Sequence, residues 1–128
     1  MTDDRRRHFT GSPFETQVAF ARSIRIGSRI VVAGTLGTDP QGRPAGDAYG
    51  QTHAALGRIA SAIEALGGSL NDVVRTRMFA LDVADFEEIG RAHAEVFAPN
   101  PPVTSFLVIS GLVVPGCVVE VEAEAEVA

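Results

Sequence analysis

Residues 101–126 read Pro-Pro-Val-Thr-Ser-Phe-Leu-Val-Ile-Ser-Gly-Leu-Val-Val-Pro-Gly-Cys-Val-Val-Glu-Val-Glu-Ala-Glu-Ala-Glu. The last part alternates strictly, with glutamate at positions 120, 122, 124 and 126 and valine or alanine between them. A period of two predicts a β-strand with one buried and one polar face. The first part is β-rich and follows a proline pair, which can open a strand without losing a ladder donor. Because Pro115-Gly116 separates the two strands, we predict that they pair as a hairpin.

Upstream of this hairpin, the pattern predicts four more strands and two helices. The predicted strands lie near residues 8–10, 18–26, 30–35 and 73–81, and the predicted helices cover 48–66 and 85–97. Leu56 and Ile59 belong to an apolar stripe of the first helix, and Asp47 is its expected N-cap. Two helices can cover only one face of a six-stranded mixed sheet, so the predicted fold class is α+β. Apolar residues that include Phe79 and Val108 are expected on the second face, where another subunit would bury them.

Length and composition favour a single folded domain. The chain has 128 residues, of which 45% are hydrophobic, enough for one domain that spans residues 1–128 and buries its own core. Residues 1–12 are polar, and we expect them to be partly flexible. The net charge of −5 argues against nucleic acid or an anionic membrane as a partner. Because no segment has the pattern of a secretion signal or a membrane span, we expect a soluble, cytoplasmic protein.

These stretches also carry a family resemblance. The element Pro102-Val103-Thr104-Ser105, followed after a gap by a strand with Glu120, resembles the C-terminal motif of the Rid (YjgF) superfamily, the reactive-intermediate deaminases. Residues 32–40 and 70–76 are similar to the family's pattern in the same order, so the resemblance covers most of the chain. It implies a chorismate-mutase-like fold and a homotrimer whose sheets form a central barrel. It also implies that a small-molecule ligand binds in the cleft between subunits.

The resemblance implies a set of cleft residues as well. In the archetypal deaminases an arginine binds the substrate carboxylate, a glutamate positions the attacking water, and an asparagine and a tyrosine shape the pocket. The glutamate position is Glu120 here, whereas Thr104 stands at the arginine position. The other positions carry Phe14 for the tyrosine, Gly90 for the asparagine and Phe106 for a cysteine that often follows the arginine. The chain therefore resembles a divergent branch of the family.

Imine hydrolysis needs a carboxylate that orients or deprotonates water and a cation that holds the carboxylate of the substrate. Glu120 is the candidate catalytic carboxylate, and the alternative is that it is one of four glutamates on an exposed strand face. Thr104 cannot replace a guanidinium, which binds a carboxylate through two charge-assisted hydrogen bonds. Arg77 is the candidate replacement cation; alternatively, it pairs with the glutamates of the last strand or takes part in a subunit contact.

Three further residues are candidates for substrate binding. His93 lies on the apolar stripe of the second helix, where a histidine is either a buried structural residue or an acid or base that titrates near neutral pH. Glu15 neighbours Phe14 and is a candidate for the same cleft. Gly34, inside a predicted strand, suggests close approach of a backbone or a ligand. No residue spacing is typical of metal ligands, and we expect neither a metal nor a cofactor.

The leading hypothesis is a small-molecule hydrolase that converts an imine or enamine to a carbonyl compound and ammonia. Because Thr104 replaces the arginine, we expect a substrate that is larger or less acidic than those of the archetype. The alternative is a non-catalytic trimer that binds a metabolite at the subunit cleft. Endoribonuclease activity has been attached to some relatives, but the acidic charge and the lack of a basic, aromatic surface argue against it here.

Overall fold

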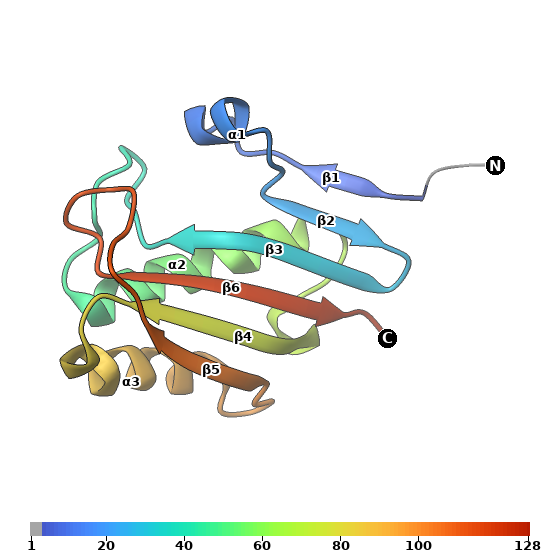
Figure 1. The fold of residues 1–128 in the computed structure, drawn as a ribbon. Helices are drawn as coiled ribbons and strands as arrows, with labels where there is room; N and C mark the ends of the chain where they lie inside the picture. The colour runs from blue at the N-terminus through green and yellow to red at the C-terminus, as the bar shows by residue number, and fades with distance from the viewer. Residues whose placement is uncertain (1–3) are drawn as a thin grey trace.

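The computed structural model describes residues 4–128, so the predicted flexibility of residues 1–3 lies outside the described residues. A six-stranded sheet runs through the molecule, with two long helices behind it (Figure 1). The elements are β1 (Arg6–His8), α1 (Pro13–Val18), β2 (Ser23–Ile26), β3 (Arg29–Leu36), α2 (Ala48–Glu64), β4 (Val73–Ala80), α3 (Phe86–Phe97), β5 (Val103–Val108) and β6 (Val119–Glu126), with 3₁₀ turns at Leu70–Asp72 and Val83–Asp85. The predicted α+β class is confirmed.

The strand order is β1-β2-β3-β6-β4-β5, which corrects the predicted closing hairpin. β6 is antiparallel to both β3 and β4, and β5 is parallel to β4 at the edge of the sheet. β4 therefore separates β5 from β6 (Figure 1). The connection over residues 109–118 is much longer than the two-residue turn of a tight hairpin, and this length lets the chain cross the end of β4. Pro115-Gly116 forms a local turn within this connection, where the Cys117 amide donates to the Val114 carbonyl.

Helices α2 and α3 cover one face of the sheet, as predicted. Asp47 caps α2 through the Gly50 amide, which donates to the Asp47 carboxylate at 2.9 Å. Leu56 and Ile59 are at most 1% exposed and pack against the inward side chains of β6. Burial of each such side chain contributes about 1.5–3 kcal/mol. Among residues 4–128, no helix is both long and apolar enough to cross a bilayer.

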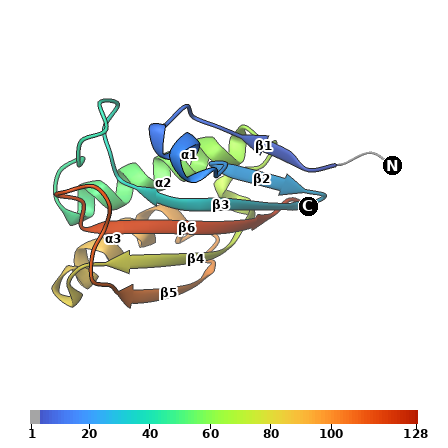
Figure 2. The ribbon, with the colours of Figure 1, turned by 45° about the horizontal axis from the view of Figure 1, so that its top comes forward.

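A short helix replaces the beginning of the predicted strand 18–26. Ser12 accepts a hydrogen bond from the Phe14 amide and Pro13 occupies the first turn, which together start α1. Ala19 ends the helix in the left-handed region, at φ 67°. The expectation of a strand from residue 18 was wrong because the serine-proline pair is a helix start. Turned by 45°, the molecule shows α1 beside the beginning of β2 (Figure 2).

The sheet face opposite α2 and α3 is mixed in character. The outward residues of β6 are glutamates, and Arg77 and Phe79 of β4 share this face with them. Val108 pairs with Ala80, and Ala80 faces the helices. Val108 therefore lies on the helix side of the sheet, which corrects the prediction that it lies on the second face. Val103 and Leu107 of the edge strand β5 are 60% and 40% exposed. An exposed apolar edge of this kind is a surface suited to contact with another chain.

Candidate functional site

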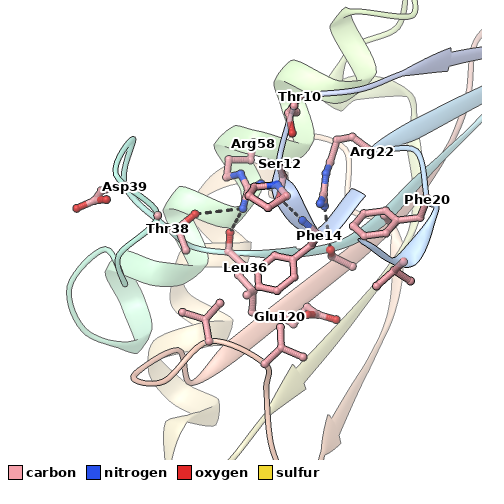
Figure 3. A pocket seen from close by; sticks show the side chains of 18 of the residues that line it. Thr10, Ser12, Phe14, Phe20, Arg22, Leu36, Thr38, Asp39, Arg58 and Glu120 are labelled. Atoms are coloured by element: carbon pink, nitrogen blue, oxygen red, sulfur yellow. Dashed lines mark hydrogen bonds between the residues drawn. The ribbon is translucent and has the colours of Figure 1, made fainter. Parts of the chain in front are cut away.

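A cavity of about 1060 Å³ lies at the end of β3 (Figure 3). Its walls come from segments that are distant in the sequence: residues 10–14 at the start of α1, 38–42 after β3, and 113–114 before β6. Phe14 is 41% exposed and contributes an apolar wall, together with Phe20. Two of the predicted site residues besides Phe14, namely Gly34 and Glu120, also line this cavity.

Glu120 projects from the second residue of β6 onto the open face of the sheet. Its side chain is half-buried, and no donor within residues 4–128 forms a hydrogen bond to its carboxylate. Burial raises the pKa of Glu120, the neighbouring Glu122 raises it further, and Arg22 opposes both effects. The carboxyl group therefore holds a proton more readily than an ordinary glutamate, and its oxygens remain available to a ligand.

Gly34 provides the space that the Glu120 side chain occupies. A β-bulge between Val32 and Thr35 places Gly34 opposite the beginning of β6. A Cβ atom on Gly34 would lie 2.9 Å from Cδ of Glu120 and closer still to its carboxylate oxygen. The sequence predicted a close approach at Gly34, and the structure shows that the approaching group is the Glu120 carboxylate.

Arg22 and Glu15 form a buried pair at the back of the cavity. The amides of Thr10 and Gly11 and the Thr10 hydroxyl donate to the Glu15 carboxylate, and these contacts lower its pKa against the opposing effect of burial. Arg22 Nε lies 3.8 Å from Glu15 Oε2, and Arg22 Nη1 donates to the Gly34 carbonyl at 2.9 Å. Glu15 does not line the cavity, whereas Arg22 does. Glu15 thus orders the turn before α1 and balances the charge of Arg22.

Arg58 reaches the cavity from the middle of α2. Its Nη1 donates to the Leu36 carbonyl at 2.7 Å and to the Thr38 hydroxyl at 3.2 Å, as the dashed lines in Figure 3 show. These bonds fix the guanidinium beside the end of β3. Burial lowers the pKa of Arg58, although Glu15 partly opposes this effect. Arg58 is thus a half-buried cation on the cavity wall.

Four other predicted site residues gather around α3 and the edge strand β5, away from this cavity. His93 Nε2 lies 2.8 Å from the Thr76 hydroxyl, which donates to the Thr104 hydroxyl at 2.7 Å. The single hydroxyl proton of Thr76 is used in that bond, so His93 Nε2 carries a proton and donates it to Thr76. Burial lowers the pKa of His93, and its ring is neutral near pH 7. Phe106 packs edge-on against Phe86, one turn before Gly90 on α3.

Arg77 lies on the open face but outside the cavity lining. Its Nη1 donates to Glu122 at 2.9 Å and lies 3.7 Å from Glu124. This arrangement is the structural alternative that the sequence left open, in which the arginine pairs with the glutamates of β6. Within one chain, Arg77 is therefore occupied by its own sheet.

Sequence reasoning did not identify Arg22 and Arg58. A signal for Arg58 does exist, because it lies three residues after Ala55 and four before Ala62, both at most 1% exposed. A charged residue on the buried stripe of a helix marks a polar site. Arg22 lies between α1 and β2 and has no periodic context that distinguishes it from a surface arginine.

The described part of the chain, residues 4–128, has no cluster of three or more histidine, cysteine or acidic side chains arranged to hold a metal ion. His53 and Glu95 do approach each other, at 3.4 Å, but they belong to an exposed network between α2 and α3 with Tyr49. The charged groups that line the cavity are the carboxylates of Asp39 and Glu120 and the guanidiniums of Arg22 and Arg58.

Comparisons with known proteins agree with this fold along nearly the whole chain. The sequence profile of the family described as Endoribonuclease L-PSP matches residues 10–127. An uncharacterised protein of Streptomyces coelicolor is 40% identical over 123 residues, which are 94% of this chain and 90% of the relative. A RutC family protein of Pyrococcus horikoshii is 31% identical over 95 residues, 73% of this chain and 75% of the relative.

Solved structures give the same result. A Mycobacterium tuberculosis member of the YjgF/YER057c/UK114 family superposes with a TM-score of 0.89 at 41% identity, over 97% of this chain and 100% of that structure. The YjgF gene product of Escherichia coli has a TM-score of 0.78 at 23% identity, over 84% of this chain and 87% of that structure. This match bears on the fold alone. The chain is therefore a member of the YjgF/Rid superfamily, to which the Endoribonuclease L-PSP profile belongs.

Proposed function

We propose that the protein hydrolyses an imine or enamine to a carbonyl compound and ammonia in the cavity above Glu120. The observation that carries this proposal is the carboxylate itself, which is half-buried, has a raised pKa and accepts no hydrogen bond from residues 4–128. A carboxylate in this state can orient a water molecule and exchange a proton with it. Family membership supports the assignment, because the matched region includes Glu120 and the resemblance of the C-terminal motif puts this residue at the family's glutamate position.

The reaction needs only water and proton transfers. Glu120 in its ionised form accepts a proton from water as the oxygen attacks the imine carbon, and the C=N bond becomes a C–N single bond. The proton then passes from Glu120 to nitrogen, which gives a carbinolamine with one hydroxyl and one amino group. Transfer of the hydroxyl proton to the amino nitrogen by way of Glu120 lets the carbonyl form as the C–N bond breaks and ammonia leaves. An enamine enters the same path after protonation at carbon. The apolar side chains of Phe14 and Phe20 suit a substrate with a sizeable hydrocarbon part.

We propose further that the active assembly is a homotrimer. Phe14, Gly34 and Glu120 line the cavity, whereas Gly90, Thr104 and Phe106 lie towards the β5 edge. A second copy that placed its β5 edge over the cavity would join both groups and cover exposed apolar side chains of β5. We expect sedimentation equilibrium to give the mass of three chains at micromolar concentration, and a monomer under those conditions would contradict this arrangement.

Ammonia release from imines generated in situ tests the proposed activity. We expect the wild-type protein to turn over at least one bulky imine and to act poorly on 2-aminoacrylate, because Thr104 replaces the arginine of the archetype. Thr104→Arg should then raise turnover of 2-aminoacrylate about tenfold or more, as expected for one added charge-assisted contact. Wild-type silence on every imine would refute the hydrolase. Thermal stabilisation by a carbonyl ligand without turnover would instead support a metabolite-binding protein.

A further inference from the structure

Arg22 is bonded to every residue of the β3 bulge, residues 33–35. Its backbone carbonyl accepts a hydrogen bond from the Ala33 amide at 3.0 Å. Its Nη1 donates to the Gly34 carbonyl at 2.9 Å and to the Thr35 hydroxyl oxygen at 3.1 Å. The Thr35 hydroxyl in turn donates to the Ala33 carbonyl at 2.7 Å. Because a bulge interrupts the hydrogen-bond ladder that fixes a regular strand, these bonds hold the bulge in shape.

The bulge is the surface against which the Glu120 carboxylate rests. A Cβ atom on Gly34 would lie 2.9 Å from Cδ of Glu120, so the carboxylate lies directly against the Gly34 backbone. No donor within residues 4–128 forms a hydrogen bond to this carboxylate, so packing on Gly34 has a large part in its placement. The Arg22 guanidinium reaches the Gly34 carbonyl from the cavity side (Figure 3). A displaced Gly34 would therefore displace the carboxylate as well.

Arg22 also carries a charge that acts on Glu120. Its side chain is only 6% exposed, so water screens this charge weakly. Burial and the neighbouring Glu122 raise the pKa of Glu120, and the attraction to Arg22 lowers it. Glu15 Oε2 lies 3.8 Å from Arg22 Nε, and this second carboxylate keeps the buried cation balanced. An arginine remains charged throughout the physiological pH range.

The other groups around the cavity do not duplicate this effect. Arg58 on α2 and Asp39 on the loop after β3 line the same cavity, but neither contributes to the shifted pKa of Glu120. The Cys117 thiol is near enough for Glu120 to raise its pKa, after the larger effect of burial, and the neutral thiol supplies no charge. Among the described residues, Arg22 is therefore the cation that opposes protonation of Glu120.

We propose that Arg22 is a positioning residue for Glu120: it fixes the β3 bulge under the Glu120 carboxylate and holds a permanent positive charge near it. The inference rests on the proposed hydrolase function and adds a residue that acts on the reaction only through Glu120. The protein itself occupies Nη1 of Arg22, which bonds to two acceptors of β3. One side chain thus controls both where the general base lies and how much of it is ionised near neutral pH.

Carbon-13 NMR titration of the glutamate carboxyl groups in the full-length protein tests the effect of the charge. Glu120→Gln assigns the Glu120 signal by its loss. We expect Glu120 to titrate at higher pH in Arg22→Gln than in wild type, because removal of a nearby cation disfavours the ionised carboxylate. Arg58→Gln is the matched control, since it removes the same charge from the same cavity, and it should leave the Glu120 titration near that of wild type. An unchanged titration in Arg22→Gln, or equal changes in both variants, would overturn the proposal.

The pH profile of ammonia release tests the effect on position. Arg22→Gln should lower kcat about ten- to a hundredfold, the loss expected for a misplaced catalytic group, and should move the acidic limb to higher pH. Arg22→Lys keeps the charge but not the planar guanidinium, so its acidic limb should stay near that of wild type while kcat recovers only in part. A loss confined to KM would indicate direct contact with the substrate and would overturn the positioning role.

The titration separates this role from the hydrolase, because it needs no turnover. A shifted Glu120 titration in Arg22→Gln, with no ammonia released from any imine, would support the action of Arg22 on Glu120 and refute the proposed activity. Ammonia release that needs Glu120 but not Arg22, with an unmoved titration, would support the hydrolase and refute the role of Arg22. Arg22→Gln leaves the Glu15 carboxylate without its cation, so melting temperatures accompany each measurement. If that variant does not fold, the double variant Arg22→Gln/Glu15→Gln replaces it, with the same expected shift.

Discussion

Replacing Glu120 with glutamine should lower kcat/KM for ammonia release about 10²- to 10⁴-fold, the range expected for loss of a general base. The amide has nearly the same shape and fits above Gly34, but it can neither accept a proton from water nor return it to nitrogen. The measurement is ammonia release from the imine on which wild type is most active. Glu126→Gln is the control, because Glu126 lies on the same strand and face but is exposed and away from the cavity. Equal losses in both variants would contradict the role of Glu120.

The raised pKa of Glu120 gives this comparison a pH dependence. Wild-type activity should rise with pH through the raised pKa, because the ionised carboxylate is the reactive form. The free energy of unfolding should change in the opposite sense, because the folded pKa of Glu120 is higher than its unfolded pKa. The stabilising contribution of Glu120 is fully present below the unfolded pKa and is lost as pH rises through the folded pKa. Glu120→Gln removes this titration, so near neutral pH it should be at least as stable as wild type. Lost activity with retained stability therefore identifies a chemical effect.

Replacing Gly37 with alanine should destabilise the fold by about 3 kcal/mol, near the upper end of the range for overpacking. A Cβ atom at Gly37 would lie 2.6 Å from the Cα atom of Gln51 and closer to its carbonyl, and a backbone cannot move aside as a side-chain tip can. The Gln51 amide group binds the carbonyls of Gly46 and Gly116 and the amide of Val118. Displacing Gln51 would therefore disturb α2 and the connection before β6 together.

Urea unfolding checks the Gly37 prediction against Gly57→Ala as a matched control. Gly57 is exposed in the middle of α2, and a Cβ atom there would have no neighbour within 4 Å. The control should be more stable than wild type by about 1 kcal/mol, the helix-propensity difference between the two residues. A Gly37→Ala variant as stable as wild type, at an unchanged m-value, would show that this packing is looser than described.

The sequence predicts which segments form strands and helices better than it predicts which strands pair in the sheet. Asp47 as the cap of α2 and the alternation of β6 follow from local rules and are present in the structure. The position of β6 between β3 and β4 is a long-range choice, and nothing in the alternating glutamates selects one partner over another. The serine-proline start of α1 is a local signal of a helix, but we interpreted residues 12–15 as a turn or an extended entry to the predicted strand.

The candidate site was predictable to a similar extent. Phe14, Gly34 and Glu120 were proposed from the sequence and line one cavity. Thr104 was proposed too, but it lies with the α3 and β5 residues, where its hydroxyl accepts a hydrogen bond from Thr76. Arg22 and Arg58 gain their importance from burial and from each other's charge, and these quantities exist only after the chain has folded.

The central position of β6 also has a consequence for synthesis. Residues 119–126 are made after every other strand, yet they join β1-β2-β3 to β4-β5. While a ribosome makes the chain, these two sheet fragments expose unpaired edges that can bind strands of other chains. The cooperative sheet can form only once β6 has left the exit tunnel. Nascent chains that stall before residue 119 should therefore be targets for chaperones.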